Sequence, residues 1–504
     1  MKVVVFIVGL FFILPLCLPA QQITFSEPLK EDSRDMNFDV IGKMKGNVIV
    51  FKNLRWKYAL NIYNDSMQLK DKLELDFIPG KTFNVDFIAY PDFFYLIYQY
   101  QKKGLLYCMA VKMDANGKKI NEPIQLDTTQ IGVLGDNKIY STINSDDKKK
   151  IILFKIQKRD NRVEFVTLLF DDQLLLKHTS RLYFDYNDRN DALSDFLLDN
   201  EGNFIFASSL KNNSRDNLST LSLVIKKPLE DSFRIKKLNL DKTYLDEVKI
   251  KVDNVNNRYV LNSLFYKERN GNIEGLYSYI WDANADSSVA KVFSFFDEEL
   301  KSMAKSSGNS KYAFNDFFIR NVILKRDGSY ILMAEDYSSQ STGSNNWNRS
   351  DYLYGSPFLS PYSYYQYYPS YGGYYRPFNN FGNQSIRYYY ENVLVISVDQ
   401  NAKPSWTNVI HKQQFSDDTD NYLSFNTFIT GSEIHFLFND ISKREKLLSD
   451  NIITADGSTK RSPTIKTFEK GYEFMPRFAK QTGFRQVILP CSYRGLICFT
   501  KIDF

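Results

Sequence analysis

A unit of about 50 to 57 residues recurs along this chain, and the repeat limits its possible folds more than any other feature. Each unit is predicted to contain a strand, a turn, an apolar strand, a hairpin, a second apolar strand, an Asp/Asn/Gly turn and a more polar strand. The segments "DFLLDNEGNFIFASSL" (195–210) and "NVILKRDGSYILMAED" (321–336) show the first half of the unit in two places. The turn after the third strand marks eight units, at Asn64, Asp114, Asp171, Lys226, Asp282, Asp399, Asp456 and Asp503.

Four-stranded antiparallel units repeated in this way resemble a β-propeller. We therefore predict an all-β propeller, residues 21–504, with eight four-stranded blades; seven blades plus an irregular segment is the alternative. The last unit ends after its third strand, and "QQITFSEPLK" (21–30) resembles the outer strand of the second unit. We expect this N-terminal segment to complete the last blade and close the ring.

The resemblance extends to the superfold and no further. The sequence contains no WD dipeptide pattern, no kelch-type double glycine and no sialidase-type Asp box, so it matches no characterised propeller family. A fold shared at this level does not determine function. No catalytic residue can therefore be transferred from a known propeller.

The first twenty residues, "MKVVVFIVGLFFILPLCLPA", are predicted to form a secretory signal peptide. Lys2 provides the positive charge, residues 3–14 the apolar run, and Ala20 a small residue at the cleavage site. Cys17 offers an alternative, a lipoprotein, although Leu16 stands where a small residue is usual. No other segment is apolar for long enough to span a membrane. We therefore expect export to the periplasm or cell surface of a Gram-negative bacterium.

The charge of the chain is nearly balanced. Lys and Arg number 64 and Asp and Glu 59, for a net charge of +5, and the two signs are interspersed. This distribution is typical of a solvated mixed surface and gives no reason to expect nucleic acid as a partner. Aromatic residues make up 15% of the chain, which suits strands with half-buried faces.

Two cysteines near the C-terminus are predicted to face each other. Cys491 and Cys498 flank "SYRGLI", and a two-residue turn at Arg494 and Gly495 would place them opposite one another in a hairpin. A disulfide in an oxidising compartment is one interpretation, and two buried thiols are the competing one. Cys108 has no evident partner.

The sequence gives no sign of a catalytic or metal centre. The three histidines, His178, His411 and His435, fall in different units and lack the spacing of zinc ligands. Phosphate-binding glycine loops and nucleophile motifs are not found. We therefore predict no catalytic residue, metal or cofactor.

One polar position recurs among the units. It lies eight residues before each second strand and is occupied in six units, by Asp39, Asp86, Ser141, Asp195, Asn321 and Asn426. We expect it to begin the innermost strand at the mouth of the central channel. In a structural interpretation, these side chains satisfy backbone N–H groups. In a functional one, the ring holds a polar or cationic ligand or a metal ion at the channel mouth, or a carboxylate pair performs acid/base hydrolysis.

The sixth unit carries a long insertion, about 337–388, between its second and third strands. Its central stretch, "SPYSYYQYYPSYGGYYRPFNN" (360–380), contains no Asp, Glu or Lys. A mixture of Tyr, Ser, Gly and Asn is typical of antibody paratopes, although low-complexity segments can also be mobile and self-associating. We expect it to overhang the face that carries the polar ring. Its candidate binding residues are Tyr362, Tyr364, Tyr365, Tyr367, Tyr368, Tyr371, Tyr374 and Tyr375.

These features favour an exported, non-enzymatic binding or scaffold propeller. It would be a monomeric ring that contacts a protein or glycan of the cell envelope through one face and the Tyr-rich loop. A glycan-active hydrolase or lyase that uses carboxylates at the channel mouth is the first alternative. A structural subunit of a cell-envelope complex is the second.

Overall fold

The structure is a computed structural model. It describes residues 21–29, 36–80, 82–131, 140–159, 162–186, 190–211, 217–304, 314, 316–341, 386–417, 419–442, 445–462 and 471–504. The predicted signal peptide (1–20) and the eight candidate tyrosines between Tyr362 and Tyr375 lie outside these residues.

The described strands fall into eight successive antiparallel groups, which we call the first to the eighth group. The first group contains β2 (Met36–Met44), β3 (Asn47–Leu54), β4 (Lys57–Tyr63) and β5 (Leu69–Glu74), and the second contains β6 (Asn84–Ala89), β7 (Phe93–Lys102), β8 (Leu105–Asp114) and β9 (Ile124–Gln130). The third group contains β10 (Tyr140–Asn144), β11 (Lys150–Arg159), β12 (Arg162–Asp171) and β13 (Leu176–Asp185). The fourth group contains β14 (Asp191–Leu198), β15 (Phe204–Lys211), β16 (Leu218–Lys226) and β17 (Arg234–Leu238).

The other four groups complete the circle. The fifth group contains β18 (Tyr244–Asp253), β19 (Arg258–Tyr266), β20 (Gly275–Asp282) and β21 (Ser287–Phe295), and the sixth contains β22 (Phe317–Leu324), β23 (Tyr330–Ser341), β24 (Ile386–Val398) and β25 (Pro404–Ile410), with β26 (Gln414–Asp417). The seventh group contains β27 (Phe425–Thr430), β28 (Glu433–Ser442), β29 (Glu445–Ile453) and β30 (Thr459–Arg461). The eighth group contains β31 (Tyr472–Phe474), β32 (Lys480–Gly483), β33 (Gln486–Tyr493), β34 (Leu496–Asp503) and β1 (Gln22–Phe25).

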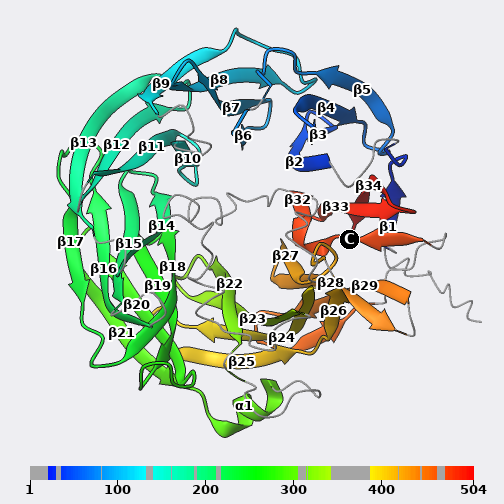
Figure 1. Cartoon of the computed structure of the whole chain (residues 1–504). Helices are drawn as coiled ribbons and strands as arrows, with labels where there is room; N and C mark the ends of the chain where they lie inside the picture. Colours follow the sequence, from blue (N-terminus) through cyan, green and yellow to red (C-terminus); the bar gives the residue numbers. More distant parts are fainter. Residues whose placement is uncertain are drawn as a thin grey trace, which may run out of the picture.

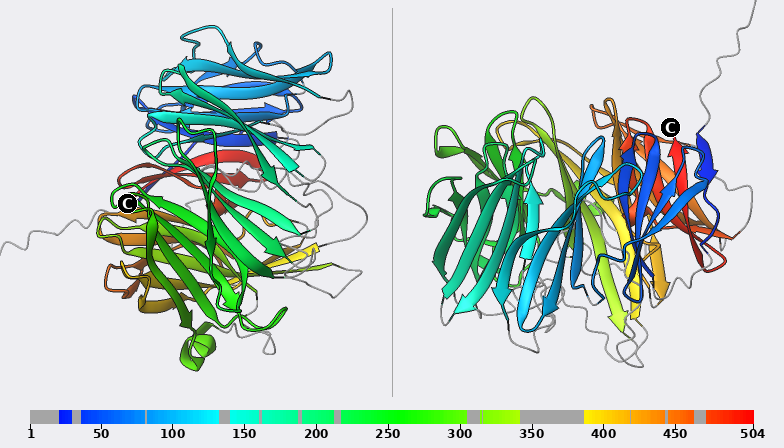
Figure 2. Two further views of the ribbon diagram at one scale, coloured as in Figure 1. Left: turned by 90° about the vertical axis from the view of Figure 1, so that its left-hand side faces the viewer. Right: turned by 90° about the horizontal axis from the view of Figure 1, so that it is seen from above.

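The groups stand side by side around a ring, with their first strands nearest the centre (Figures 1 and 2). The fourth and fifth groups share one bridge, between Leu218 and Leu245. This arrangement is a β-propeller, so the predicted fold class is confirmed. Among the described residues, no helix has the length and apolar character to cross a lipid bilayer.

The N-terminal strand closes the ring, as predicted. β1 pairs with β34, from Gln22 opposite Asp503 to Phe25 opposite Thr500. The pairing continues beyond the strand, because Ser26 N–H donates to Phe499 O at 2.8 Å. The outer edge of the eighth group is therefore covered by the opposite end of the chain.

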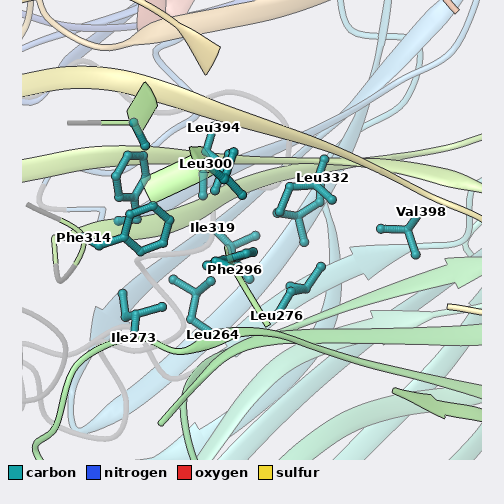
Figure 3. Packing of buried hydrophobic residues seen from close by; sticks show 14 of the residues in the cluster. Leu264, Ile273, Leu276, Phe296, Leu300, Phe314, Ile319, Leu332, Leu394 and Val398 are labelled. Carbon is teal, nitrogen blue, oxygen red and sulfur yellow. The ribbon is translucent and has the colours of Figure 1, made fainter. Parts of the chain in front are cut away.

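Apolar clusters join each group to the next. Leu264 and Leu276 of the fifth group, for example, pack with Ile319, Leu332 and Leu394 of the sixth (Figure 3). Another cluster contains Val48 of the first group and Phe499 of the eighth, so the same packing continues across the closure. Burying the face of one group against the next is the main source of stability in a repeat fold.

The marker residues of the repeat shape the turns between third and fourth strands. Asp114 Oδ1 accepts hydrogen bonds from the N–H groups of Asn116 and Lys118, at 2.9 and 2.8 Å. Asn64, Asp171 and Asp399 make the same two contacts with the residues two and four positions later. These side-chain turns are the local cause of the repeat pattern.

Three elements lie outside the predicted repeat. The connection between the fifth and sixth groups contains helix α1 (Glu298–Ala304), whose Leu300 and Ala304 are buried in the cluster shown in Figure 3. Strand β26 follows the fourth strand of the sixth group and pairs with the start of β24. A short 3-10 helix, η2 (Pro476–Phe478), separates β31 from β32.

One side of the ring carries the hairpins between second and third strands. The start of each innermost strand lies beside these hairpins, as the pairing of Met36 with Leu54 and of Phe317 with Asp336 demonstrates. We call this side the hairpin face. The arm and its base lie on the hairpin face, and the predicted polar ring lies along the inner strands.

Candidate binding face

The sixth group has an arm on the hairpin face. β23 and β24 are 12 and 13 residues long, and their pairing continues to Ser341 opposite Ile386. β26 pairs with residues 387–390 of β24 and adds a third strand. We call residues 337–341, 386–390 and 414–417 the arm. Residues 337–341 and 386–388, at the two ends of the predicted insertion, are therefore strand, and residues 342–385 lie outside the described part of the chain.

An aromatic cluster forms the base of the arm. Phe318, Tyr337, Tyr390 and Leu423 are buried together, and Tyr388 packs against them. The guanidinium carbon of Arg320 lies 5.5, 5.6 and 5.9 Å from the ring centres of Phe318, Tyr337 and Tyr390. Cation–π contacts of this kind are strongest where water is excluded.

A buried carboxylate next to this cluster forms ion pairs with two basic side chains. Glu335 is fully buried, and its two carboxylate oxygens lie 2.8 Å from Lys412 Nζ and 3.2 Å from Arg320 Nε. Ser424 Oγ donates a further hydrogen bond at 2.7 Å. Burial lowers the pKa of Lys412, and the neighbouring Glu335 opposes that shift. The network links the second strand of the sixth group to the seventh group.

A second ion pair fixes the arm from the other side. Arg477 of η2 forms two contacts with Asp420, at 2.6 and 3.1 Å. The hydroxyl of Tyr390, on the arm, donates to the same carboxylate at 2.8 Å. Two-point pairs of this type hold both side chains in one orientation. Three groups, the sixth, seventh and eighth, thus meet at the base of the arm.

An unusual acid lies at the same base. Asp336 is buried, and burial raises its pKa from 3.8 to about 8, helped by the neighbouring Asp316 and Glu391 carboxylates. At neutral pH, Asp336 is therefore mainly protonated and able to donate a hydrogen bond. The charge state of the base of the arm changes in a pH range near neutrality.

The outer surface of the arm is exposed and rich in aromatic and basic groups. Phe415 is 48% exposed, and the Arg387 guanidinium lies 5.4 Å from its ring centre. Arg387 also pairs with Asp417 through two contacts, at 2.7 and 3.1 Å. Tyr389 donates a hydrogen bond to Gln340 at 3.3 Å across the hairpin. Residues of these types are enriched at protein interfaces.

The comparisons with known proteins identify no family. No family model and no curated protein matches the chain. Solved structures that resemble it include prolyl oligopeptidase B from Galerina marginata (8% identity, TM-score 0.41, 92% of this chain and 56% of that one). Others are the Nup133 β-propeller domain from Vanderwaltozyma polyspora (11%, 0.38, 83% and 99%) and the polysaccharide lyase Uly1 (9%, 0.36, 83% and 89%). The chain spans just over half of the oligopeptidase, and no residue's role is taken from these likenesses.

Ser141 and Asn426 are the second residues of β10 and β27, near the strand start as predicted, and Asp86 is the third residue of β6. The other three residues of the predicted polar ring lie farther along their innermost strands. Asp39 is the fourth residue of β2, and Asp195 and Asn321 are the fifth residues of β14 and β22. The prediction of their position is therefore wrong by up to four residues. Bulges between Val40 and Gly42, and next to Asp195 and Asn321, add residues to the inner strands and shift the count.

Three ring residues bind the next group. Asp195 Oδ2 accepts a hydrogen bond from the backbone N–H of Ile250 at 2.7 Å. Asn321 Nδ2 donates to Thr427 Oγ1 at 3.2 Å, and Asn426 Nδ2 donates to Ala479 O at 2.8 Å. The contact of Asp195 with a backbone N–H agrees with the structural interpretation. Across the boundary between groups, Asn321 and Asn426 instead donate, to a hydroxyl and to a backbone carbonyl.

Asp39 and Asp86 form a different pair. Burial raises the pKa of Asp39 from 3.8 to about 6, the Lys480 charge opposes that rise, and the Asp86 carboxylate adds to it. Lys480 begins β32 of the eighth group, so the three side chains come from three consecutive groups around the closure. The sequence pattern revealed the two acids but not the lysine, which does not occupy the repeated position.

The two cysteines agree with the second of their two interpretations, a pair of buried thiols. Cys491 and Cys498 are directly opposed in the β33–β34 hairpin, as predicted, and both are free, buried thiols. Cys491 Sγ lies 3.1 Å from Thr500 Oγ1, and Cys498 Sγ donates to the Cys491 carbonyl at 3.5 Å. The two sulfur atoms therefore have polar partners other than each other. Cys108 is also a buried thiol.

One hydrogen-bonded triad was not anticipated from the sequence. His435 contacts Thr430 Oγ1 at 2.7 Å through Nε2 and Asp450 at 3.0 Å through Nδ1. All three side chains are buried, and Phe428 stacks on the imidazole at 4.2 Å between centres. This arrangement resembles a hydrolase triad in its order of groups, but Phe428 covers the ring. We interpret it as internal polar packing on the side opposite the hairpin face.

The charged residues of the arm's base were also missed. Each carries a signal that could have found it: Arg320 stands alone in the apolar strand "FFIRNVIL", and Glu335 ends the apolar strand "YILMAE". A single charge in an otherwise buried strand needs a partner, because an unpaired buried charge is very costly. The sequence does not reveal which partner, since Glu335 and Lys412 are far apart along the chain.

Proposed function

We propose that this chain is an exported, non-enzymatic binding or scaffold propeller, which holds a protein or glycan of the bacterial cell envelope against its hairpin face. The arm is the observation that carries the proposal. It is the longest hairpin among the described strands, and three groups of the ring hold its base. Binding sites are commonly placed on extended connections that a rigid scaffold positions.

The arm suits binding because its outer surface is already ordered before a partner arrives. Tyr389, Phe415 and Arg387 contact one another or their strand neighbours, so little side-chain freedom remains to be lost. A preordered aromatic and basic surface lowers the entropic cost of association. We propose that the tyrosines between 342 and 385, which lie outside the described residues, bind the same partner.

The test compares three variants for retention of a partner from cell-envelope extracts. Phe415→Ser removes the exposed aromatic group of the arm, and replacing residues 342–385 by a short Asn-Gly turn removes the insertion. Phe484→Ser is the matched control, because Phe484 is 66% exposed and lies on the other side of the ring. We expect the first two variants to lose a partner that the wild type and the control retain.

Equal retention by all variants would contradict an arm-centred site. A partner that remains at a fixed ratio through size-exclusion chromatography would favour a structural subunit of an envelope complex. Reversible exchange would favour a binding module. Either result keeps the arm as the contact, provided that Phe415→Ser weakens it.

A second candidate function rests on Asp39 and Asp86. A carboxyl group with a raised pKa beside a carboxylate is the pattern of acid and base pairs in glycan hydrolysis. Under this candidate, Asp39→Asn and Asp86→Asn each abolish turnover of an envelope polysaccharide. Asp195→Asn should retain turnover, because Asp195 accepts its hydrogen bond from the Ile250 backbone. Equal activity in all three variants would exclude the carboxylate pair.

A further inference from the structure

A cavity lies between the first and second groups, away from the arm. Its volume is about 90 Å³, and its lining comes from β2, β3, β4 and the start of β6. In Figure 1, these strands lie on the opposite side of the ring from β23 and β24. Among the residues that the structure describes, the lining contains no charged side chain; it consists of Asn37, Phe51, Asn53, Tyr58, Thr82, Phe83, Asn84 and Val85.

Two polar atoms in this lining lack partners. Asn37 Oδ1, an acceptor, and Asn84 Nδ2, a donor, are both buried without a hydrogen bond in the described part of the chain. Buried polar atoms without partners are rare, because each loses its hydrogen bond to water without compensation. An acceptor and a donor that line one cavity indicate that a molecule inside it completes both bonds.

The rest of the wall limits the chemistry of that molecule. Phe51 and Phe83 present aromatic surface, and Tyr58 stacks on Phe51 with ring planes 14° apart. The Tyr58 hydroxyl accepts a hydrogen bond from Thr82 N–H at 3.2 Å, which fixes the ring. The described lining, of neutral amides and aromatic rings, disfavours a charged ligand and suits a compact group with hydroxyls on an apolar ring.

We propose that this cavity binds one neutral sugar residue, such as the end of a glycan chain. A hydroxyl group donates to Asn37 Oδ1, a second oxygen accepts from Asn84 Nδ2, and the apolar face of the ring packs against the aromatic wall. The cavity volume of about 90 Å³ admits one sugar ring at most. A single water already needs roughly 10 to 15 Å³ of the same kind of space, so the cavity holds only a few water-sized groups. The site is independent of the arm, and losing either one leaves the other intact.

The experiment uses the protein without residues 1–20 and three probes. Methyl glucoside and N-acetylglucosamine are the neutral sugars, and glucuronate is the charged comparison; saturation-transfer NMR and calorimetric titration measure binding. We expect dissociation constants on the order of 1 mM for at least one neutral probe, as is usual for single small ligands. Glucuronate is expected to bind at least about tenfold more weakly, because the cavity would desolvate its charge.

Two substitutions remove the proposed contacts. Asn37→Leu and Asn84→Leu keep the side-chain volume nearly constant and delete the unpartnered atom, and each should weaken binding by about tenfold. Val85→Leu adds one methylene to the wall and should weaken binding by reducing the space, which provides a variant with the amides intact. Urea midpoints should stay at or above the wild-type value for the two asparagine variants, because no satisfied bond is lost.

A matched control is available in the same group. Asn61 is fully buried, and its Oδ1 also lacks a partner, but it does not line the cavity. Asn61→Leu should therefore leave the affinity unchanged. The proposal is wrong if no neutral probe binds the wild type, if glucuronate binds as tightly, or if Asn37→Leu and Asn84→Leu bind like Asn61→Leu. In the first of those cases the cavity contains water alone.

Discussion

Arg477 and Asp420 hold each other through two contacts, Nη1 to Oδ2 at 2.6 Å and Nη2 to Oδ1 at 3.1 Å. Arg477 belongs to the eighth group, and Asp420 precedes the first strand of the seventh. The Tyr390 hydroxyl, from the sixth group, donates to the same carboxylate. Residues of the seventh and eighth groups therefore anchor the arm, which belongs to the sixth group. The orientation of the arm depends on these contacts between groups.

Arg477→Lys should destabilise the protein, because an ammonium group cannot make both contacts in one plane. We expect a loss of about 1 to 3 kcal/mol in the free energy of unfolding, measured in urea. Arg387→Lys is the matched control: it breaks a pair of the same geometry, but both side chains are about half exposed. Exposed pairs contribute little, so the control should unfold like the wild type. Equal losses in both variants would contradict this account.

Asp336 should make stability fall as pH rises. Its pKa is 3.8 in the unfolded chain and about 8 in the folded protein, so the folded state binds the proton more tightly. The stabilisation is complete below about pH 4 and is lost as pH rises through about 8. Asp336→Asn removes this dependence, so the variant should gain stability relative to the wild type between pH 4 and 8.

Urea unfolding at several pH values measures that difference. Asp185→Asn is the control, because the Asp185 side chain is 100% exposed. The control should follow the wild-type curve throughout the range. A constant gap between Asp336→Asn and the wild type would mean that Asp336 is ionised in the folded protein.

Deleting residues 21–29 should open the ring. The deletion removes β1 and the Ser26 contacts to Phe499, and it exposes the edge of β34. We expect a loss of roughly 3 kcal/mol or more and concentration-dependent association through the free edge, detected by thermal unfolding and light scattering. Gln22→Ala changes only an exposed side chain of the same strand and should behave like the wild type. A deletion variant that stays monomeric and equally stable would refute closure by β1.

The thiols should react only after unfolding. Burial raises the pKa of Cys491 well above its usual value, which keeps it as an unreactive thiol. In native protein that lacks residues 1–20, a thiol reagent should find no reactive group. In denaturant it should titrate Cys108, Cys491 and Cys498 together. A single reactive thiol in denaturant would instead reveal a disulfide between the last two.

Much of the fold follows from local chemistry that the sequence displays. Asp114 and Asp399 mark their turns because each carboxylate accepts two backbone N–H groups within five residues. Such contacts depend on neighbours in the chain and therefore repeat with the sequence. The closing strand was predictable for a related reason: the last unit lacked one strand, and the segment at 21–30 had the matching pattern.

The candidate sites were harder to predict from the sequence, because they depend on contacts between segments that are far apart along the chain. Bulges in the inner strands moved Asp195 and Asn321 from the predicted start of each strand to its middle. Glu335 accepts a hydrogen bond from Ser424, which lies 89 residues later in the chain, and only the packing of two groups brings the two residues together. β26 was missed because four residues with an exposed face have no pattern that distinguishes a strand from a loop.

The closing pair has a kinetic consequence. The hydrogen bond between Phe499 N–H and Ser26 Oγ joins residues 473 positions apart. During synthesis, β1 emerges first and has no partner until β34 is complete, so its pairing groups stay available to other chains for most of that time. Loop closure over such a distance costs entropy that is recovered only in the last step. Folding of this ring should therefore be slow and limited by its final strand, whatever the speed of the groups between.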